Sequence, residues 1–548
     1  MKKKTIKHIA IICLLVCVMI LSSCGLNKSN SDSSTSISKE DATGNGFDTD
    51  SKASGDTDDL GSANKEDGNV DDLGSDYEGS SDSDVSPETE AVKALFYDVF
   101  STMKSDAMDD TVRLAEVNPE MTPVSLYDDS YNTYTEEIDV YTIEMDGHKM
   151  QYTVDIYGEP DENGLYPLYI ALHGGGSTTV EDNNSNWLQM RDYYSDSVTN
   201  GIYVTTRGME DVWNLHFLDY SYAMYDRLIE DMVLLGNADP NRVYLLGFSA
   251  GGDGVYAIAP RMADRFAAVN MSSGHPNGVS LLNTASLPFQ IQVGIRDFYS
   301  EDAMRSLRGA EFEKTFNEYH ETFNFGYPHS VLVHVPNGHN YNDYSRDSDD
   351  NLVLTAPAEF AERCAAENWL DRFMAVYSSL GYDADISGLS YAYGDEVLDN
   401  KLMDLITNDL GMDCSYDTNT NAIDYVSSYT RDPAPEKLVW DLSTRAPGRK
   451  DSSFYWLKAD QSVNKGVIFI NYNKDNNSVE VWTDGNVNGS FSILATPFLM
   501  DFKRPLTIIT PNGEYTKELK ADKDVIEASI KETGDMYLGW AQEIPINP

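Results

Sequence analysis

The residue with the clearest chemical potential is a serine between two glycines. Ser249 lies in the run Gly247-Phe248-Ser249-Ala250-Gly251, directly after an apolar stretch and directly before a segment with helical apolar spacing. A strand, a sharp glycine turn and a helix would expose the serine hydroxyl at the carboxyl edge of a sheet, where it can act as a nucleophile. The pattern alone is a weak signal, because a chain of 548 residues can contain one match by chance, so its surroundings must support the prediction.

Candidates for the base and the acid follow this serine along the chain. A serine hydroxyl is a weak nucleophile until a base takes its proton and an acid orients that base. In the fold that carries such a turn, acid and histidine come after the serine in that order, each in a loop after a strand. One predicted strand leads into Asp297 and the next leads into His339. Each could be an ordinary loop residue by itself, but their joint placement predicts a triad of Ser249, His339 and Asp297, with Asp343 as the rival acid.

Backbone amides that could bind an oxyanion are expected at two places. The amide of Ala250 follows the serine, and the run His173-Gly174-Gly175-Gly176 ends an earlier predicted strand. Glycines let backbone N–H groups approach a substrate closely, so Gly174 and Gly175 are the further predicted donors. The alternative is that these glycines form only a turn.

Three other side chains lie in loops expected at the same edge of the sheet. Trp213 could form an apolar or sugar-facing wall, although packing in the interior is the simpler interpretation. His216 and His275 are candidates for substrate contact, with loop capping as the alternative.

From about Tyr166 to His339 the chain resembles serine esterases of the α/β-hydrolase fold. The nearest branch is that of poly(3-hydroxybutyrate) depolymerases and feruloyl or acetyl-xylan esterases. The matching blocks are Leu172 to Gly176, Asp239 to Tyr244, the serine turn with Gly251-Gly252, and Ala263 to Ala268. The resemblance implies the same triad and the same amide donors. The chain departs from that family after His339, where the sequence is longer, and beyond Thr430, where a further domain follows.

The elements that must position these residues alternate between strands and helices. Strands are predicted at 138–143, 150–156, 168–172, 201–206, 267–271, 289–294 and 330–335, besides the run from Arg242 into the serine turn. Helices are predicted at 87–116, 220–235, 250–262 and 301–323. The first two strands form a hairpin, and the others suit a mostly parallel sheet covered by helices on both faces, the α/β-hydrolase fold.

The remaining sequence divides into further regions. Residues 91–430 are expected to form the catalytic domain, with an insertion or lid at about 345–420 where the pattern weakens. Residues 431–548 contain mainly short strands with turn residues between them, which predicts a smaller, mostly β accessory domain.

The N-terminus is typical of an exported lipoprotein. Four lysines precede an apolar run that is short for a membrane span, and Leu21-Ser22-Ser23-Cys24 follows it. This predicts a signal peptide at 1–23, lipid attachment at Cys24 and a position at the outer face of the cell membrane, with an ordinary secretory signal as the alternative. Residues 24–90 are rich in Ser, Asp and Gly and predict a disordered acidic tether.

Charge and composition exclude several partners and cofactors. A net charge of −50 argues against binding nucleic acid or an anionic lipid surface. Neither a CxxC nor an HExxH spacing indicates a metal site, and no cofactor is expected. Cys364 and Cys414 could pair outside the cell, but the sequence does not decide this.

The sequence thus predicts a cell-surface serine esterase acting on a small or polymeric ester, such as an acyl or feruloyl ester of a polysaccharide or a polyester. One alternative is a serine exopeptidase of the same fold, although no propeller-like repeat precedes the catalytic region. The other is a surface glycan-binding protein with a vestigial site, against which the intact set of catalytic residues argues.

Overall fold

The computed structural model describes residues 85–546, apart from gaps at 129, 276–277, 295–296, 298–304, 335–338, 340–343, 347–351, 355–412, 415–417 and 450–451. The predicted signal peptide, Cys24 and the tether up to residue 84 lie outside the described residues, as do Cys364, Asp343 and most of the predicted insertion.

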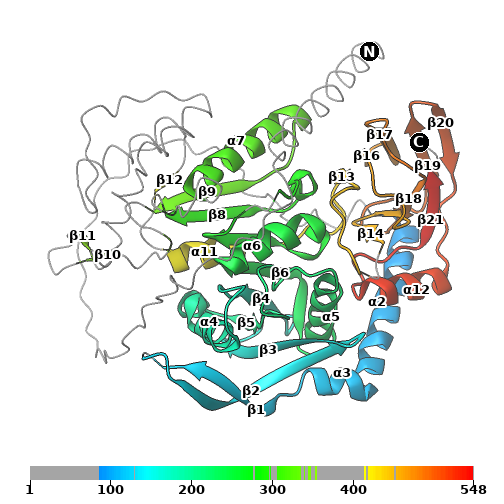
Figure 1. Cartoon of the computed structure of the whole chain (residues 1–548). Helices are drawn as coiled ribbons and strands as arrows, with labels where there is room; N and C mark the ends of the chain where they lie inside the picture. The colour runs from blue at the N-terminus through cyan, green and yellow to red at the C-terminus, as the bar shows by residue number, and fades with distance from the viewer. Residues whose placement is uncertain are drawn as a thin grey trace, which may run out of the picture.

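The centre of the molecule is a ten-stranded sheet in the order β1-β2-β3-β5-β4-β6-β7-β8-β9-β12 (Figure 1). Its strands are β1 (Glu120–Tyr127), β2 (Thr133–Met145), β3 (His148–Tyr157), β4 (Tyr166–Leu172), β5 (Gly201–Thr206), β6 (Ala238–Phe248), β7 (Ala268–Ser272), β8 (Phe289–Gly294), β9 (His329–His334) and β12 (Asp413–Cys414). The strands from β5 to β12 pair in parallel, whereas β1, β2 and β3 are antiparallel. The predicted hairpin forms around Asp146-Gly147, both with positive φ, as a two-residue turn requires.

Helices cover both faces of the parallel part, because alternate side chains of each strand point to opposite sides. Along β4, Leu168 and Ile170 pack into one core, and Tyr169 and Ala171 pack into a second one. The helices that contribute to the first core include α5 (Ser221–Leu234), α6 (Ala250–Ile258) and α7 (Arg305–Phe323), and those that contribute to the second include α4 (Val180–Tyr193) and α11 (Thr418–Ser427). This arrangement confirms the predicted parallel sheet between two helical layers and is that of the α/β-hydrolase fold.

The predicted N-terminal helix is interrupted at one residue. It forms α2 (Pro87–Asp109) and α3 (Thr111–Glu116), separated by Asp110. The carboxylate of Asp110 accepts hydrogen bonds from the amides of Val112 and Arg113, at 2.9 and 3.3 Å, and so starts the second helix.

The C-terminal part is mostly β, as predicted, and forms two sheets. One has the order β13-β16-β17-β19-β20 and the other the order β14-β15-β18-β21. The strands are β13 (Lys437–Asp441), β14 (Ser453–Phe454), β15 (Leu457–Ala459), β16 (Val467–Asn473), β17 (Ser478–Thr483), β18 (Phe491–Ala495), β19 (Leu506–Thr510), β20 (Gly513–Lys517) and β21 (Gln542–Ile546). Helix α12 (Lys523–Thr533) packs beside α2, so the first helix of the described residues lies against the C-terminal β domain (Figure 1).

The junction between the two parts is polar and buried. The Arg431 guanidinium, which is almost fully buried beside the Asp535 carboxylate, donates across the junction to the Asn241 side-chain oxygen at 2.8 Å and to the Asp264 carbonyl at 2.7 Å. The Arg449 guanidinium binds the carboxylates of Asp226 and Asp264 at 2.6 and 3.2 Å. Removing one partner of such a pair leaves a buried charge and typically costs about 3–5 kcal/mol. The β domain is therefore fixed to the catalytic domain by compensated charges as well as by the first core, which continues into it.

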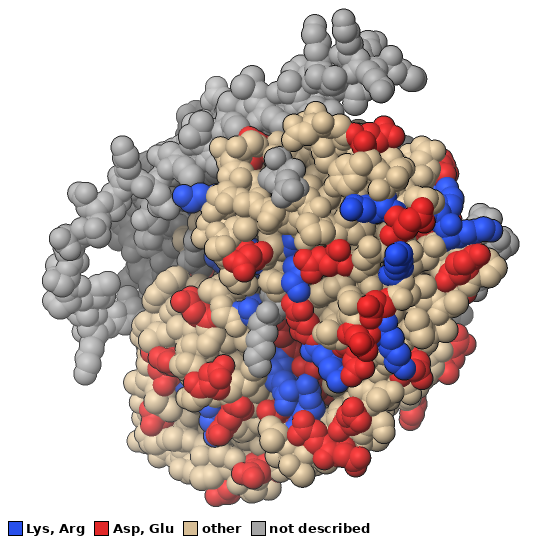
Figure 2. All heavy atoms as spheres, turned by 90° about the vertical axis from the view of Figure 1, so that its right-hand side faces the viewer, with Lys and Arg blue, Asp and Glu red and all other residues tan. Residues whose placement is uncertain are grey.

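The described surface carries charges of both signs. On the face in Figure 2, Lys and Arg side chains lie among Asp and Glu side chains. Lys523, for example, lies 3.1 Å from Asp98, and Lys531 lies 2.7 Å from Glu527. Within the described ranges, no helix combines the length and apolar character needed to cross a bilayer.

Candidate active site

Ser249 lies at the sharp turn between β6 and α6. Its backbone has φ 57° and ψ −119°, a conformation that costs free energy for any residue other than glycine. The close packing of the turn explains its two glycines. A Cβ atom at Gly247 would lie 2.2 Å from the Gly251 carbonyl oxygen, and one at Gly251 would lie 2.0 Å from the Leu172 carbonyl oxygen. The turn therefore fits closely against the end of β4.

The histidine and the aspartate predicted from strand order lie beside this serine. His339 follows β9, and its Nε2 lies 2.9 Å from the Ser249 hydroxyl oxygen. Its Nδ1 lies 2.9 Å from Oδ2 of Asp297, which follows β8. An ionised carboxylate only accepts hydrogen bonds, so Nδ1–H donates to Asp297 and Nε2 is left to accept the serine proton. This is the arrangement that general-base catalysis requires.

The Asp297 carboxylate is buried and ionised. Burial alone would raise its pKa, but the positive charge of Arg305 and the contacts with His339 and Ser273 outweigh that effect and lower the pKa. Arg305 Nη1 lies 3.1 Å from Asp297 Oδ1, so the two carboxylate oxygens have different partners. Nothing in the sequence singles out Arg305 as a partner of Asp297 except its position at the start of α7.

The glycine run after β4 lies beside the serine. A Cβ atom at Gly174 would lie 3.2 Å from the Ser249 Cβ, and Gly175 and Gly176 have positive φ. The Gly176 amide donates to the Asn183 side-chain oxygen at 2.9 Å, and the Asn183 amide group donates back to the Gly176 carbonyl at 2.9 Å. Asn183, a buried residue of α4 that the sequence analysis did not identify, thus fixes this loop. Since the Gly176 amide is engaged, Gly174 and Gly175 remain the predicted donors of the loop.

Ala250 is the first residue of α6, where backbone N–H groups have no acceptor inside the helix. The helix dipole also favours negative charge at this end. Its amide thus has the position expected of a donor to an oxyanion, next to the serine.

Two buried histidines form hydrogen bonds with the backbone of the glycine loop. The Gly208 amide donates to His173 Nε2 at 2.8 Å, so His173 Nδ1–H donates to the Gly174 carbonyl. His216 Nε2 donates to the His173 carbonyl at 2.9 Å. Burial lowers the pKa of both imidazoles, that of His173 well below its ordinary value and that of His216 to about 4. The proposed contact of His216 with substrate does not fit this placement, because the side chain is fully buried.

The other two candidate contact residues have different surroundings. Trp213 is 55% exposed, and its ring meets the Phe217 ring edge-on at 5.3 Å. Its backbone lies next to Gly176, since a Cβ atom there would be 3.5 Å from the Trp213 Cα. His275 is half-buried and its amide donates to the Asp253 carboxylate on α6. Only Trp213 is therefore both largely exposed and adjacent to the glycine loop.

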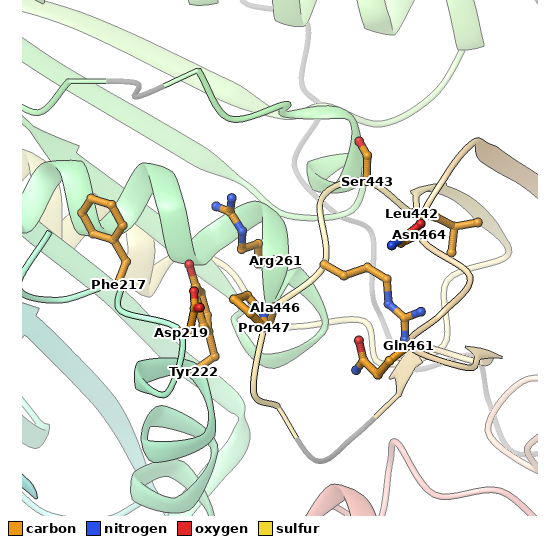
Figure 3. A pocket seen from close by; sticks show the side chains of 11 residues that line it. Phe217, Asp219, Tyr222, Arg261, Leu442, Ser443, Ala446, Pro447, Gln461 and Asn464 are labelled. Atoms are coloured by element: carbon orange, nitrogen blue, oxygen red, sulfur yellow. The ribbon is translucent and has the colours of Figure 1, made fainter. Parts of the chain in front are cut away.

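A cavity of about 350 Å³ lies at the junction of the two domains (Figure 3). Phe217, Tyr222 and Arg261 line it from the catalytic domain, and Ser443 and Gln461 line it from the β domain. None of the three predicted triad residues contributes to this lining, so the cavity is separate from Ser249. Among the described residues, no cluster of His, Cys, Asp and Glu could hold a metal ion.

Comparisons with known proteins give no family for this chain. No protein-family model matches the sequence, and no curated protein matches it. A thermostable esterase aligns at a TM-score of 0.28 and 16% identity, over 38% of this chain and 62% of its own. The poly(3-hydroxybutyrate) depolymerase LpqC of Bordetella parapertussis aligns at a TM-score of 0.31 and 17% identity, over 42% of this chain and 88% of its own. A puromycin-hydrolysing peptidase of Mycobacterium tuberculosis aligns at a TM-score of 0.28 and 17% identity, over 37% of this chain and 36% of its own. Similarity at this level carries no information about the substrate.

The depressed pKa of His216 predicts how stability depends on pH. In the unfolded chain a histidine titrates near about 6.5, whereas folded His216 titrates at about 4. Between these values only the unfolded chain takes up the proton, so stability is full above about pH 6.5 and falls toward pH 4 by up to about 1.4 kcal/mol per pH unit. We expect His216→Gln to make the loss between pH 7 and pH 5, measured by urea denaturation, shallower than in the wild type.

The matched control is His320→Gln, which removes an exposed histidine of α7 and should keep the wild-type slope. Equal slopes for wild type and His216→Gln would show that His216 takes up its proton without unfolding, in contradiction to its burial.

Proposed function

We propose that the chain is a serine hydrolase that cleaves a carboxylic ester through an acyl-enzyme. The observation that carries this proposal is the pair of 2.9 Å contacts of His339, one with the Ser249 hydroxyl and one with the Asp297 carboxylate. It is supported by the strained turn at Ser249 and by the glycine loop beside it. The residues come from the ends of different strands, so the fold rather than the local sequence brings them together.

The proposed reaction proceeds in two halves. In the first, the Ser249 oxygen attacks the ester carbonyl carbon while His339 Nε2 takes the hydroxyl proton. The amides of Gly175 and Ala250 stabilise the negative oxygen of the tetrahedral intermediate, with Gly174 as the neighbouring donor. When the C–O bond to the alcohol breaks, His339 gives its proton to the leaving oxygen, and the acyl group remains on Ser249.

In the second half, water replaces the alcohol. His339 takes a proton from the water as its oxygen attacks the acyl carbon, and then returns that proton to Ser249 as the acid leaves. Asp297 stabilises the imidazolium in both halves and keeps the ring in its tautomer, held in turn by Arg305. Removing one oxyanion donor typically lowers kcat by about 10²–10³.

Asp297→Asn should lower kcat on p-nitrophenyl acetate at neutral pH by about 10³–10⁴, with little change in KM. The neutral amide can neither fix the imidazole tautomer nor stabilise the imidazolium. The matched control is Asp343→Asn, which removes a carboxylate close to His339 in sequence and should cost about tenfold or less. The opposite ranking would show that the acid comes from the segment after the histidine.

The same protein should be compared on an ester and on an amide. The triad chemistry suits both, and the alternative is an exopeptidase. We expect kcat/KM on p-nitrophenyl acetate to exceed that on alanine p-nitroanilide by well over tenfold. Faster cleavage of the anilide would favour the peptidase, and cleavage of neither would favour a binding protein with a vestigial site.

We also propose that the enzyme is exported and held at the membrane through lipid on Cys24, which rests on the sequence alone. Replacing Cys24 with Ser should move the protein from the membrane fraction to the medium and leave its specific activity on p-nitrophenyl acetate unchanged. A variant that stays in the membrane fraction would contradict the anchor.

A further inference from the structure

A cleft of about 800 Å³ leads away from the glycine loop. Gly175 forms part of its lining, and the walls come from α4 and from the β1–β2 pair. Figure 1 shows β1 and β2 along the edge of the molecule, on the same side as α4. Gly175 adjoins Gly174, whose Cβ position is 3.2 Å from that of Ser249. The cleft therefore reaches the loop that faces the catalytic serine.

Tyrosines of the β1–β2 pair line this cleft. They are Tyr127, Tyr131 and Tyr134. The rings of Tyr127 and Tyr131 are 5.9 Å apart and inclined at 59°. Tyr131 is 50% exposed and Tyr134 is 44% exposed, so packing in the core does not account for them. Tyrosine offers an apolar ring face and a polar hydroxyl, and it suits ligands that present both kinds of surface.

The wall that carries these tyrosines is held in place by its own contacts. A small separate core forms beneath it from Val124, Leu126, Ile138, Val140 and Trp187. The Asp128 carboxylate accepts hydrogen bonds from the amides of Ser130 and Asn132, at 2.9 and 2.8 Å, and fixes the turn between β1 and β2. A binding surface fixed before the ligand arrives costs less ordering free energy on binding.

The β1 strand is also tied to α4 across the cleft. The Asn184 side-chain amide donates to the Ser125 carbonyl at 2.9 Å, and the Tyr127 amide donates to the Ser185 hydroxyl at 3.3 Å. Direct hydrogen bonds therefore hold together β1 and α4, which form the two walls of the cleft.

The charge of the cleft restricts its ligand. Four carboxylates line it, those of Asp128, Glu136, Asp182 and Asp192. The one basic side chain in the lining, Arg191, is held by the Asp155 carboxylate through two contacts of 2.8 and 3.1 Å. A polymer that carries carboxylates or phosphates would be repelled here, whereas hydroxyl groups could donate hydrogen bonds to the carboxylates.

We propose that this cleft binds the chain of an uncharged polysaccharide, one ester of which reaches Ser249. Pyranose and furanose rings present C–H faces to aromatic rings and hydroxyl groups to carboxylates, which is the combination found here. A polyester chain has no hydrogen-bond donors for these carboxylates, and a polyuronate would bring like charges together. The inference rests on the proposed esterase function and names its substrate class.

The test compares polymer and small ester in the same variants. In each of the variants Tyr131→Ala and Tyr134→Ala, the ratio of kcat/KM on acetylated, uronate-free xylan to kcat/KM on p-nitrophenyl acetate should fall about two- to twelvefold, since an aromatic contact is typically worth about 0.5–1.5 kcal/mol. The matched control is Tyr97→Ala, which removes a tyrosine of α2 that is 49% exposed and does not line the cleft. Its ratio should equal that of the wild type.

Charge is tested with a second polymer. At low ionic strength the wild type should hydrolyse acetylated xylan at least tenfold faster than acetylated polygalacturonate. The double variant Glu136→Gln, Asp192→Asn removes two of the repelling carboxylates, so the ratio of the rate on acetylated xylan to the rate on acetylated polygalacturonate should fall. Added salt screens the same repulsion and should lower this ratio in the wild type.

The outcomes separate this inference from the proposed function. If the wild type does not hydrolyse p-nitrophenyl acetate, the esterase function itself is wrong. If it does, but the tyrosine variants keep the wild-type ratio, or if polygalacturonate is the better substrate, the cleft does not bind a neutral polysaccharide. A loss in the tyrosine variants on poly(3-hydroxybutyrate) rather than on xylan would assign the cleft to a polyester.

Discussion

The constraint on which the rest of the structure depends is the close approach of the serine turn to the end of β4. Backbone atoms of Gly251 and Leu172 leave no room for a side chain, so the turn is possible only with glycine. This packing fixes the position of Ser249 at the end of β6 relative to the end of β4. His339, which follows β9, then lies beside its hydroxyl, Asp297, which follows β8, lies beside His339, and the glycine loop after β4 lies against its Cβ. A buried, positively charged partner keeps the acid ionised, and two neutral histidines beneath the glycine loop keep charge out of the interior.

The central strands and the triad positions could be predicted because their signals are local or follow from strand order. β5 and β8 have the predicted bounds, since each contains β-branched and aromatic residues and is buried at every position. Segments that bury few of their residues lack such a pattern of apolar residues in the sequence. β20 is exposed along its whole length, and α4 buries only three of its residues, so neither shows a periodic apolar pattern. Both were missed for this reason.

The supporting residues could not be predicted because their roles depend on contacts between distant segments. Asn183 fixes the glycine loop from a helix with no apolar periodicity, and Arg305 reaches Asp297 from the start of α7. His216 has the sequence context of a loop residue at the active edge, yet its side chain is buried under the loop it was expected to flank. The acidic, tyrosine-lined cleft likewise needs β1, which the sequence did not indicate, beside α4.

The measurement that tests the central claim most directly is covalent labelling of the nucleophile. The protein would be treated with a fluorophosphonate, digested, and its peptides mapped by mass spectrometry. Attack by an activated serine on phosphorus expels fluoride and leaves one stable phosphonyl group. We expect a single adduct on Ser249, formed in parallel with loss of p-nitrophenyl acetate hydrolysis and absent from Ser249→Ala. An adduct on a different residue, or full inactivation without modification of Ser249, would contradict the assignment of this serine as the nucleophile.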